Sequence, residues 1–257
     1  METTYNFHGY EIPIDLMVMT GGGPDTLESI SDAHINGLKR YVGLAAGQSA
    51  LEIGCGIGRD AIPLIDILGP SGSYLGVDIT RPSIEWCQQH ITAKHKNFTF
   101  HHFDVKDQFY NKSGKLLTRD CTLPAQDESI DLVILQSVFT HMFPDDIKHY
   151  LKEFRRVLKK GGLIFATVFL YSDEILASAR QPNRIPSNLR FEHETTEGFR
   201  INDLLWPTGA VALTEKFFDG LLEDSGLFKV RALKGFWSGF YSDPDPYMGQ
   251  DALILSK

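Results

Sequence analysis

The residues best suited to chemistry lie in one short segment, Leu51–Asp60, which reads LEIGCGIGRD. Apolar residues typical of a buried strand are interrupted by one acid, Glu52. Glycines then stand at alternate positions, at Gly54, Gly56 and Gly58. Glycine has no Cβ, so the backbone can turn tightly and approach a ligand closely. Such a turn between a strand and a helix is typical of a nucleotide-like ligand bound at the carboxyl end of a parallel strand.

The glycine spacing and the acid help to choose the ligand. The dinucleotide fingerprint G-x-G-x-x-G holds a pyrophosphate at a helix N-terminus, but here the third glycine comes one residue early. A carboxylate at Glu52 is a poor neighbour for a diphosphate and a good one for a cation. The segment therefore favours a positively charged nucleotide-like ligand.

Two further acids follow predicted strands. Asp78 ends a strand predicted over 72–79 and lies twenty residues past Gly58, close to the position of a carboxylate that binds ribose hydroxyls. Two carboxylate oxygens match two vicinal hydroxyl donors. Asp104 ends a third strand, predicted over 97–105, and a fourth strand is predicted over 129–136.

The chain resembles the class I methyltransferases that use S-adenosylmethionine. The features that carry this resemblance, by their order and spacing, are the glycine turn, Asp78, Asp104 and the helix end at 153–162. The resemblance covers about Ala45 to Phe169 well, and the tail from Thr214 to Lys257 acceptably. It implies S-adenosyl-L-methionine as cofactor and S-adenosyl-L-homocysteine as product. It also implies an α/β, Rossmann-like fold: a doubly wound, seven-stranded, mostly parallel sheet with an antiparallel last strand and helices on both faces.

The resemblance implies roles for individual residues. Asp78 is expected to bind the ribose, Asp104 the adenine amino group, and the backbone N–H of Val105 a ring nitrogen. Asp107 is an alternative to Asp104, and Arg59 is a candidate for the cofactor carboxylate. The complete set of expected cofactor-binding residues is Glu52, Gly54, Cys55, Gly56, Gly58, Arg59, Asp78, Ile79, Asp104, Val105 and Gln136.

His141 is a candidate general base. It follows the fourth predicted strand, where methyl acceptors bind in this fold, and a neutral imidazole can take a proton from a hydroxyl or ammonium nucleophile. The alternative is a structural histidine that holds the turn before Pro144–Asp146, which looks like a helix start. His101 and His102 point to opposite faces of a strand, so we expect no metal site.

The acceptor is less well defined by sequence. The stretch Leu135–Val138 reads LQSV, not the Asp/Asn-Pro-Pro-Tyr/Phe pattern of enzymes that methylate amino groups of adenine, cytosine or glutamine. The net charge of −8 also argues against a general nucleic-acid binder. We therefore expect a small-molecule acceptor methylated on oxygen or nitrogen, and no nucleic-acid or membrane partner. Four arginines are either solvated or recognise an anionic acceptor: Arg180, Arg184, Arg190 and Arg200.

We predict a single methyltransferase domain over 1–257, with an N-terminal arm and helix at 1–46, an insertion at 106–126 and a substrate lid at 170–207. The hydrophobic content of 42% and charged content of 23% are ordinary for a soluble enzyme. The sequence shows no secretory signal and no apolar run of about 18 residues, so a cytoplasmic location is expected. Trp237 and Tyr241 are expected in the core rather than at a pocket mouth. The oligomeric state is left open.

Two other functions are consistent with these residues. A nicotinamide-dependent oxidoreductase shares the sheet and the ribose acid, although the glycine spacing and Glu52 count against it. A non-catalytic protein that keeps the S-adenosylmethionine pocket as a sensor or scaffold is the second alternative.

Overall fold

The structure is a computed structural model that describes residues 3–181, 189–240 and 249–257. Two compact units make up the chain, Met1–Ile134 and Leu135–Lys257. None of the helices in the described part of the chain is long and apolar enough to cross a membrane.

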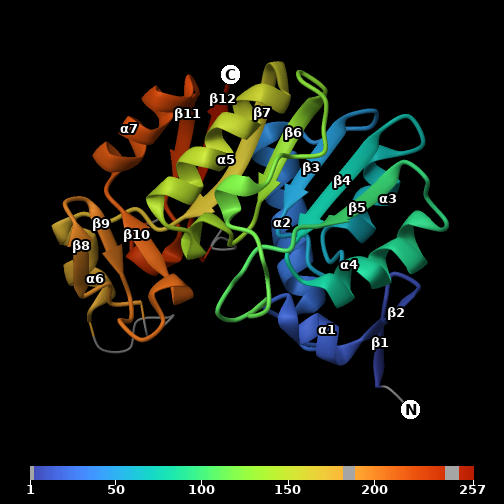
Figure 1. Cartoon of the computed structure of the whole chain (residues 1–257), viewed down its shortest axis with the longest axis horizontal. Coiled ribbons are helices and arrows are strands. Elements are labelled where there is room, and N and C mark those ends of the chain that lie inside the picture. Colours follow the sequence, from blue (N-terminus) through green and yellow to red (C-terminus); the bar gives the residue numbers. More distant parts are fainter. Residues whose placement is uncertain (1–2, 182–188, 241–248) are drawn as a thin grey trace. The chain divides into compact units, whose positions relative to one another are not determined.

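Seven strands form the main sheet (Figure 1). They are β3 (Ser49–Ile53), β4 (Ser73–Asp78), β5 (Phe98–His102), β6 (Ile130–Leu135), β7 (Leu158–Val168), β11 (Phe228–Leu233) and β12 (Asp251–Ser256). Their order is β11-β12-β7-β6-β3-β4-β5. β3, β4 and β5 are parallel, whereas β12 is antiparallel to both β7 and β11. The predicted Rossmann-like α/β sheet with an antiparallel last strand is therefore confirmed.

The first unit opens with a hairpin that the sequence analysis did not predict. β1 (Thr4–Phe7) and β2 (Tyr10–Pro13) are joined at His8 and Gly9, whose φ values of 48° and 82° suit a tight turn of type I′. The short helix α1 (Ile14–Met19) follows. The residues predicted as an N-terminal arm thus form a hairpin and a helical turn.

Three helices and two short helical turns complete the first unit. They are α2 (Leu27–Val42), α3 (Ala61–Leu68), α4 (Arg81–Cys87), η1 (Gln88–Thr92) and η2 (Thr118–Asp120). The parallel register pairs Ile53 with Val77 and Asp78 with His102. The carboxyl ends of β3, β4 and β5 therefore lie along one edge of the sheet, which places the glycine turn beside the end of β4.

The second unit contains a small sheet in addition to its part of the main one. Its helical elements are η3 (Phe139–His141), α5 (Pro144–Val157), α6 (Asp173–Ala179), η4 (Pro207–Gly209), α7 (Glu215–Ser225) and η5 (Phe236–Ser238). β8 (His193–Thr196), β9 (Phe199–Ile201) and β10 (Val211–Leu213) form the three-stranded antiparallel sheet. The predicted lid contains α6, β8 and β9, and the Arg184 named above lies outside the described residues.

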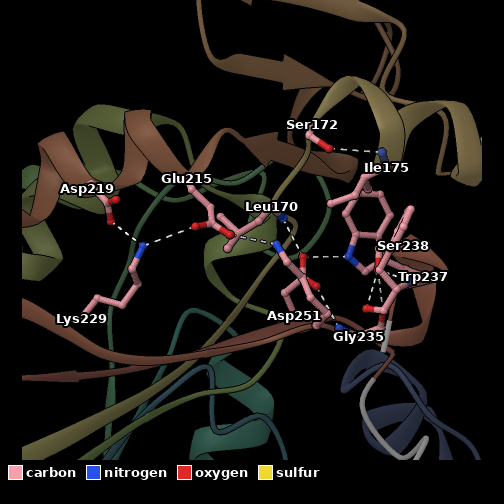
Figure 2. A network of polar contacts seen from close by, with 12 residues as sticks. Leu170, Ser172, Ile175, Glu215, Asp219, Lys229, Gly235, Trp237, Ser238 and Asp251 are labelled. Carbon is pink, nitrogen blue, oxygen red and sulfur yellow. Dashed lines mark hydrogen bonds and ion pairs between the residues drawn. The ribbon is translucent and has the colours of Figure 1, made fainter. Parts of the chain in front are cut away.

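A buried carboxylate ties three segments of the second unit together. Asp251 accepts hydrogen bonds from the backbone N of Leu170 and of Gly235, both at 2.8 Å, and from Nε1 of Trp237 at 2.9 Å (Figure 2). Burial raises the pKa of Asp251 to about 6, although these donors oppose the shift. Trp237 is 2% exposed, so its predicted place in the core is confirmed. Tyr241 lies outside the described residues.

Candidate cofactor and acceptor sites

The glycine turn joins β3 to α3. Gly54, Gly56 and Gly58 have φ values of 77°, 52° and 82°, a region that residues with a Cβ rarely adopt. The backbone N of Gly54 donates to the carbonyl of Val77 at 2.7 Å, and N of Gly58 donates to the carbonyl of Cys55 at 2.9 Å. The first bond fastens the turn to β4, and the second closes it. The predicted spacing of glycines thus matches the backbone geometry.

Asp78 is oriented by the same turn. One carboxylate oxygen accepts from the backbone N of Gly56 and the other from N of Thr80, both at 2.7 Å. Burial raises the pKa of Asp78, while these N–H donors oppose the shift. Each oxygen has a second lone pair. The side chain is only partly buried, so two fixed oxygens can accept from a pair of ribose hydroxyls.

Glu52 lies on β3 and is 3% exposed. Its Oε2 accepts a hydrogen bond from the hydroxyl of Tyr74 on β4. Burial, followed by the negative charge of Asp60, raises the pKa of Glu52 to about 8. A positive charge bound nearby would favour the ionised form of this acid.

A buried ionic cluster at the start of α3 was missed by the sequence analysis. Asp60 is 1% exposed, and its carboxylate lies 2.6 Å from Nδ1 of His34 and 3.4 Å from Nε of Arg59. Burial alone would raise the pKa of Asp60, but the charges of His34 and Arg59 lower it below its usual range. Ser31 donates to the carbonyl of Arg59 at 3.1 Å. Ser31 and His34 stand three residues apart on α2, a spacing that places them on one helix face.

The N-terminal arm contacts the glycine turn. Oγ1 of Thr20 accepts from the backbone N of Ile57 at 3.2 Å, and the carbonyl of Thr20 accepts from Nη1 of Arg59 at 3.0 Å. A Cβ added at Gly56 would lie 2.5 Å from Cγ2 of Thr20. The guanidinium of Arg59 is therefore bound to the arm and to Asp60, and its contact with the cofactor carboxylate stays a prediction.

The insertion folds back onto Asp104. Nδ2 of Asn111 donates to Oδ1 of Asp104 at 3.1 Å and to the carbonyl of Val105 at 3.0 Å. The carbonyl of Asp104 accepts from two further backbone N–H groups of the insertion, at 2.9 and 3.0 Å. Oδ1 of Asp107 accepts from the backbone N of Phe109 and Tyr110, at 2.7 and 2.8 Å. The carboxylate of Asp107 thus closes a turn. This favours Asp104 over Asp107 as the residue that binds the adenine amino group.

The remaining predicted residues of this unit have structural contacts. Cys55, which lies within the turn between Gly54 and Gly56, is buried at 2% exposure. Nε2 of His102 lies 3.1 Å from the carbonyl of Ile79, and His101 is exposed. Among the residues that the structure describes, no group of three or more His, Cys, Asp or Glu side chains is placed to hold a metal ion.

His141 and Gln136 belong to the second unit. Gln136 follows β6 and is 8% exposed. Nδ1 of His141 lies 2.9 Å from the carbonyl of Thr208 in η4. A carbonyl only accepts, so Nδ1 must carry the proton, and Nε2 of the neutral ring then holds the lone pair. A general base requires this lone pair on Nε2. The structural alternative placed His141 in the turn before Pro144–Asp146, whereas this bond joins it to η4.

Ser137 shows that the loop after β6 has an unusual backbone. It has a φ of 59°, which is uncommon for a residue with a Cβ. Its backbone N donates to Oγ1 of Thr167 at 2.7 Å, and its hydroxyl accepts from Nε2 of Gln250 at 2.8 Å. Neighbouring strands of the second unit therefore hold the residue that follows Gln136 in a left-handed conformation.

The second unit also has an open pocket of about 550 Å³. Its lining is Tyr171, Ser172, Asp173, Ile175, Thr214, Glu215 and Lys234. Nζ of Lys234 lies 3.0 Å from Oε1 of Glu215. The ammonium group of Lys234 and the carboxylate of Glu215 thus form an ion pair in the lining of this pocket.

Comparison with known proteins finds similarity to methyltransferases. A family model described as a methyltransferase domain matches residues 51–166, the segment that contains the glycine turn, Asp78 and Asp104. This match spans less than half of the chain, and it makes residues 51–166 similar to a methyltransferase domain. A fibrillarin structure from Aeropyrum pernix with natively bound S-adenosyl-L-methionine shares the fold, with a TM-score of 0.52, 14% identity and coverage of 90% of this chain and 76% of that one.

Individual relatives of the chain are distant. An arsenite methyltransferase of Aquipseudomonas alcaligenes is 29% identical over 164 residues, which are 61% of this chain and 44% of that protein. A tRNA N(3)-cytidine methyltransferase of Gallus gallus is 27% identical over 126 residues, 48% of this chain and 31% of that protein. The chain thus spans less than half the length of these curated relatives. A methyltransferase structure from Aquifex aeolicus shares the fold, with a TM-score of 0.54, 15% identity and coverage of 93% of this chain and 96% of that one.

The residues of the first unit fit S-adenosylmethionine as a cofactor. Asp78 offers two oriented oxygens for ribose hydroxyls at the carboxyl end of β4. The sulfonium and ammonium groups of the cofactor are positive, and the buried acids Glu52 and Asp60 lie next to the turn. A cation near Glu52 and Asp78 would offset the desolvation that raises the pKa of both carboxyls.

Proposed function

We propose that this protein transfers the methyl group of S-adenosylmethionine to an oxygen or nitrogen of a small-molecule acceptor. The observation that carries the proposal is the hydrogen bond from Gly56 in the glycine turn to Asp78 at the end of β4. It joins the two motifs into one site with a fixed pair of acceptor oxygens. The relatives' names refer to acceptors of different classes, arsenite and tRNA. The support for a small-molecule acceptor therefore comes from the sequence, namely the net charge of −8 and the LQSV stretch.

In the proposed site, each predicted residue of the first unit has one task. Asp78 accepts from the ribose hydroxyls, Asp104 accepts from the adenine amino group, and the N–H of Val105 donates to a ring nitrogen. Glu52 lowers the electrostatic cost of the bound positive charge. The turn residues, with Arg59 and Ile79, complete the proposed contacts of the first unit. Gln136, a residue of the second unit, stays a predicted contact.

His141 is the proposed general base. When bound, S-adenosylmethionine would supply a methyl group on a positively charged sulfur. A lone pair of the acceptor would bond to the methyl carbon, and the sulfur would leave in line with the electron pair of the broken bond. Because Nδ1–H donates to the carbonyl of Thr208, Nε2 is the atom that takes the acceptor's proton. The imidazolium that results keeps its bond to Thr208, so the ring stays oriented through the step.

Calorimetric titration of cofactor-stripped protein tests the cofactor site. S-adenosylhomocysteine is expected to bind with a micromolar Kd, and Asp78→Ala is expected to weaken binding about 100-fold, because two charge-assisted hydrogen bonds are lost. Asp32→Ala, which removes an exposed acid of α2, is the control and should bind normally. Tighter binding of NADH than of S-adenosylhomocysteine would contradict the proposal.

Steady-state kinetics test the base. With an acceptor hydroxyl, His141→Gln should lower kcat about 100-fold or more. Near-normal turnover of the variant at every pH would show that His141 is only structural.

A further inference from the structure

The second unit exposes three consecutive apolar side chains in the loop between β9 and β10. The backbone N of Asn202 donates to the carbonyl of Ala210 at 2.9 Å and closes this loop. At its tip, Leu204, Leu205 and Trp206 are 65%, 81% and 48% exposed. We name these three residues the apolar tip. Contiguous exposed apolar surface of this kind marks a binding site more often than a plain surface loop.

The apolar tip has a defined shape. Oδ1 of Asp203 accepts from the backbone N of Leu205 at 2.7 Å and of Trp206 at 3.4 Å. The carbonyl of Trp206 accepts from N of Gly209 at 2.9 Å. An aspartate that bonds the backbone two residues on fixes a turn. The turn therefore holds the apolar side chains outward instead of letting them fold into the core.

The apolar tip is joined to the candidate base. Thr208, two residues beyond Trp206, accepts the Nδ1–H of His141. Phe143, two residues beyond His141, is 39% exposed, and its ring lies edge-on to that of Phe199 in β9 at 5.8 Å. The base, the tip and a further exposed aromatic ring thus belong to one connected group within the second unit.

Three arginines of the same segment have hydrogen-bond or ion-pair partners within it. Arg180 donates to two backbone carbonyls at 2.9 and 3.1 Å. Arg190 and Arg200 each pair with a glutamate, at 2.8 and 2.9 Å. Three of the four arginines considered for an anionic acceptor therefore have partners within the segment itself, and Arg184 lies outside the described residues. The loop that bonds His141 through Thr208 exposes the apolar side chains of Leu204, Leu205 and Trp206.

We propose that the methyl acceptor is an apolar molecule with one hydroxyl or amino group, whose apolar body packs on Leu204–Trp206 and Phe143 while its nucleophile meets Nε2 of His141. This proposal rests on the methyl transfer proposed above and names the substrate class for it. It replaces the anionic acceptor that the arginines had left open. A bilayer surface or a second copy of the chain is a different occupant of the tip, and the experiment separates them.

A series of 4-alkylphenols is the probe, titrated calorimetrically into protein saturated with S-adenosylhomocysteine. From phenol to 4-hexylphenol, the Kd is expected to fall about threefold to fourfold per added methylene, as for burial of a CH₂ group. The double variant Leu204→Ser/Leu205→Ser should lose most of this dependence on chain length. Val230→Ser is the matched control, because Val230 is an apolar residue of β11 that is 54% exposed. It should behave as the wild type.

Tryptophan fluorescence locates the bound probe. Trp206 is 48% exposed, whereas Trp86 and Trp237 are 7% and 2% exposed. A bound alkylphenol should therefore change the emission of the wild type, and Trp206→Phe should abolish that change.

Several results would overturn the proposal. The Kd could be independent of alkyl length, or equal in the wild type and the double variant. Co-sedimentation with phosphatidylglycerol vesicles that the double variant loses would assign the tip to a bilayer. A dimer in analytical ultracentrifugation that the double variant loses would assign it to a second copy. If the wild type does not bind S-adenosylhomocysteine, the proposed function itself fails, which the first titration shows separately.

Discussion

The buried acid of the glycine motif should make the protein less stable as the pH rises. The pKa of Glu52 is raised by burial from 4.5 to about 8. Between these values the folded protein keeps a proton that the unfolded chain has lost. The stabilisation is therefore complete below pH 4.5 and is lost as the pH rises towards 8. The loss is about 1.4 kcal/mol per pH unit, or about 5 kcal/mol over the whole window.

Glu52→Gln removes this titration. Glutamine is neutral at every pH and keeps an oxygen that can accept from the hydroxyl of Tyr74, as Glu52 does. The stability of the variant relative to the wild type should increase by about 3–4 kcal/mol between pH 5 and pH 8. A saturating concentration of S-adenosylmethionine should reduce this increase, because a nearby positive charge favours the ionised carboxylate.

Urea unfolding at pH 5, 6.5 and 8 measures the effect, with the free energy of unfolding obtained at each pH. Glu85→Gln is the control, because it makes the same change at an exposed glutamate of α4. A difference between Glu52→Gln and the wild type that is the same at all three pH values would mean that Glu52 is ionised in the folded protein. The argument from burial would then be refuted.

Two substitutions examine other carboxylates. Asp251→Asn should destabilise the protein by about 2–4 kcal/mol, because the amide NH₂ would face N–H donors that the carboxylate now binds; a loss below about 0.5 kcal/mol in urea unfolding would speak against this. Asn111→Ala should weaken S-adenosylhomocysteine binding about tenfold, since one oriented hydrogen bond to Asp104 is lost. It should also lower the preference for S-adenosylhomocysteine over S-inosylhomocysteine, with exposed Lys112→Ala as control; an unchanged preference would exclude a positioning role.

The features that sequence predicted well are those that neighbouring residues determine. The positive φ angles of the glycine turn follow from Gly54, Gly56 and Gly58 themselves. The limits of α7 are equally local, because Thr214 caps its first turn and Gly226 ends it with a φ of 71°. Strand order and the antiparallel β12 came from the family resemblance, and no local signal in the chain specifies them.

The features that sequence missed depend on contacts between distant residues or on very short strands. His34 and Asp60 are 26 residues apart in the sequence, and no sequence pattern near either residue predicts their contact. β9 and β10 have three residues each, too few for an alternating pattern to be recognised. The hairpin at His8 and Gly9 did have a signal, a glycine between two alternating apolar runs, which the interpretation as a simple arm passed over.

The contacts of the glycine turn with residues before it bear on how this domain can be recombined with others. The segment that matches the family begins at Leu51, yet residues 57–60 form hydrogen bonds or an ion pair with Thr20, Ser31 and His34. A chimera grafted at Leu51 would contain every glycine of the motif, but the carboxylate of Asp60 would be buried without its imidazole partner. A modular boundary for this domain therefore lies before Thr20.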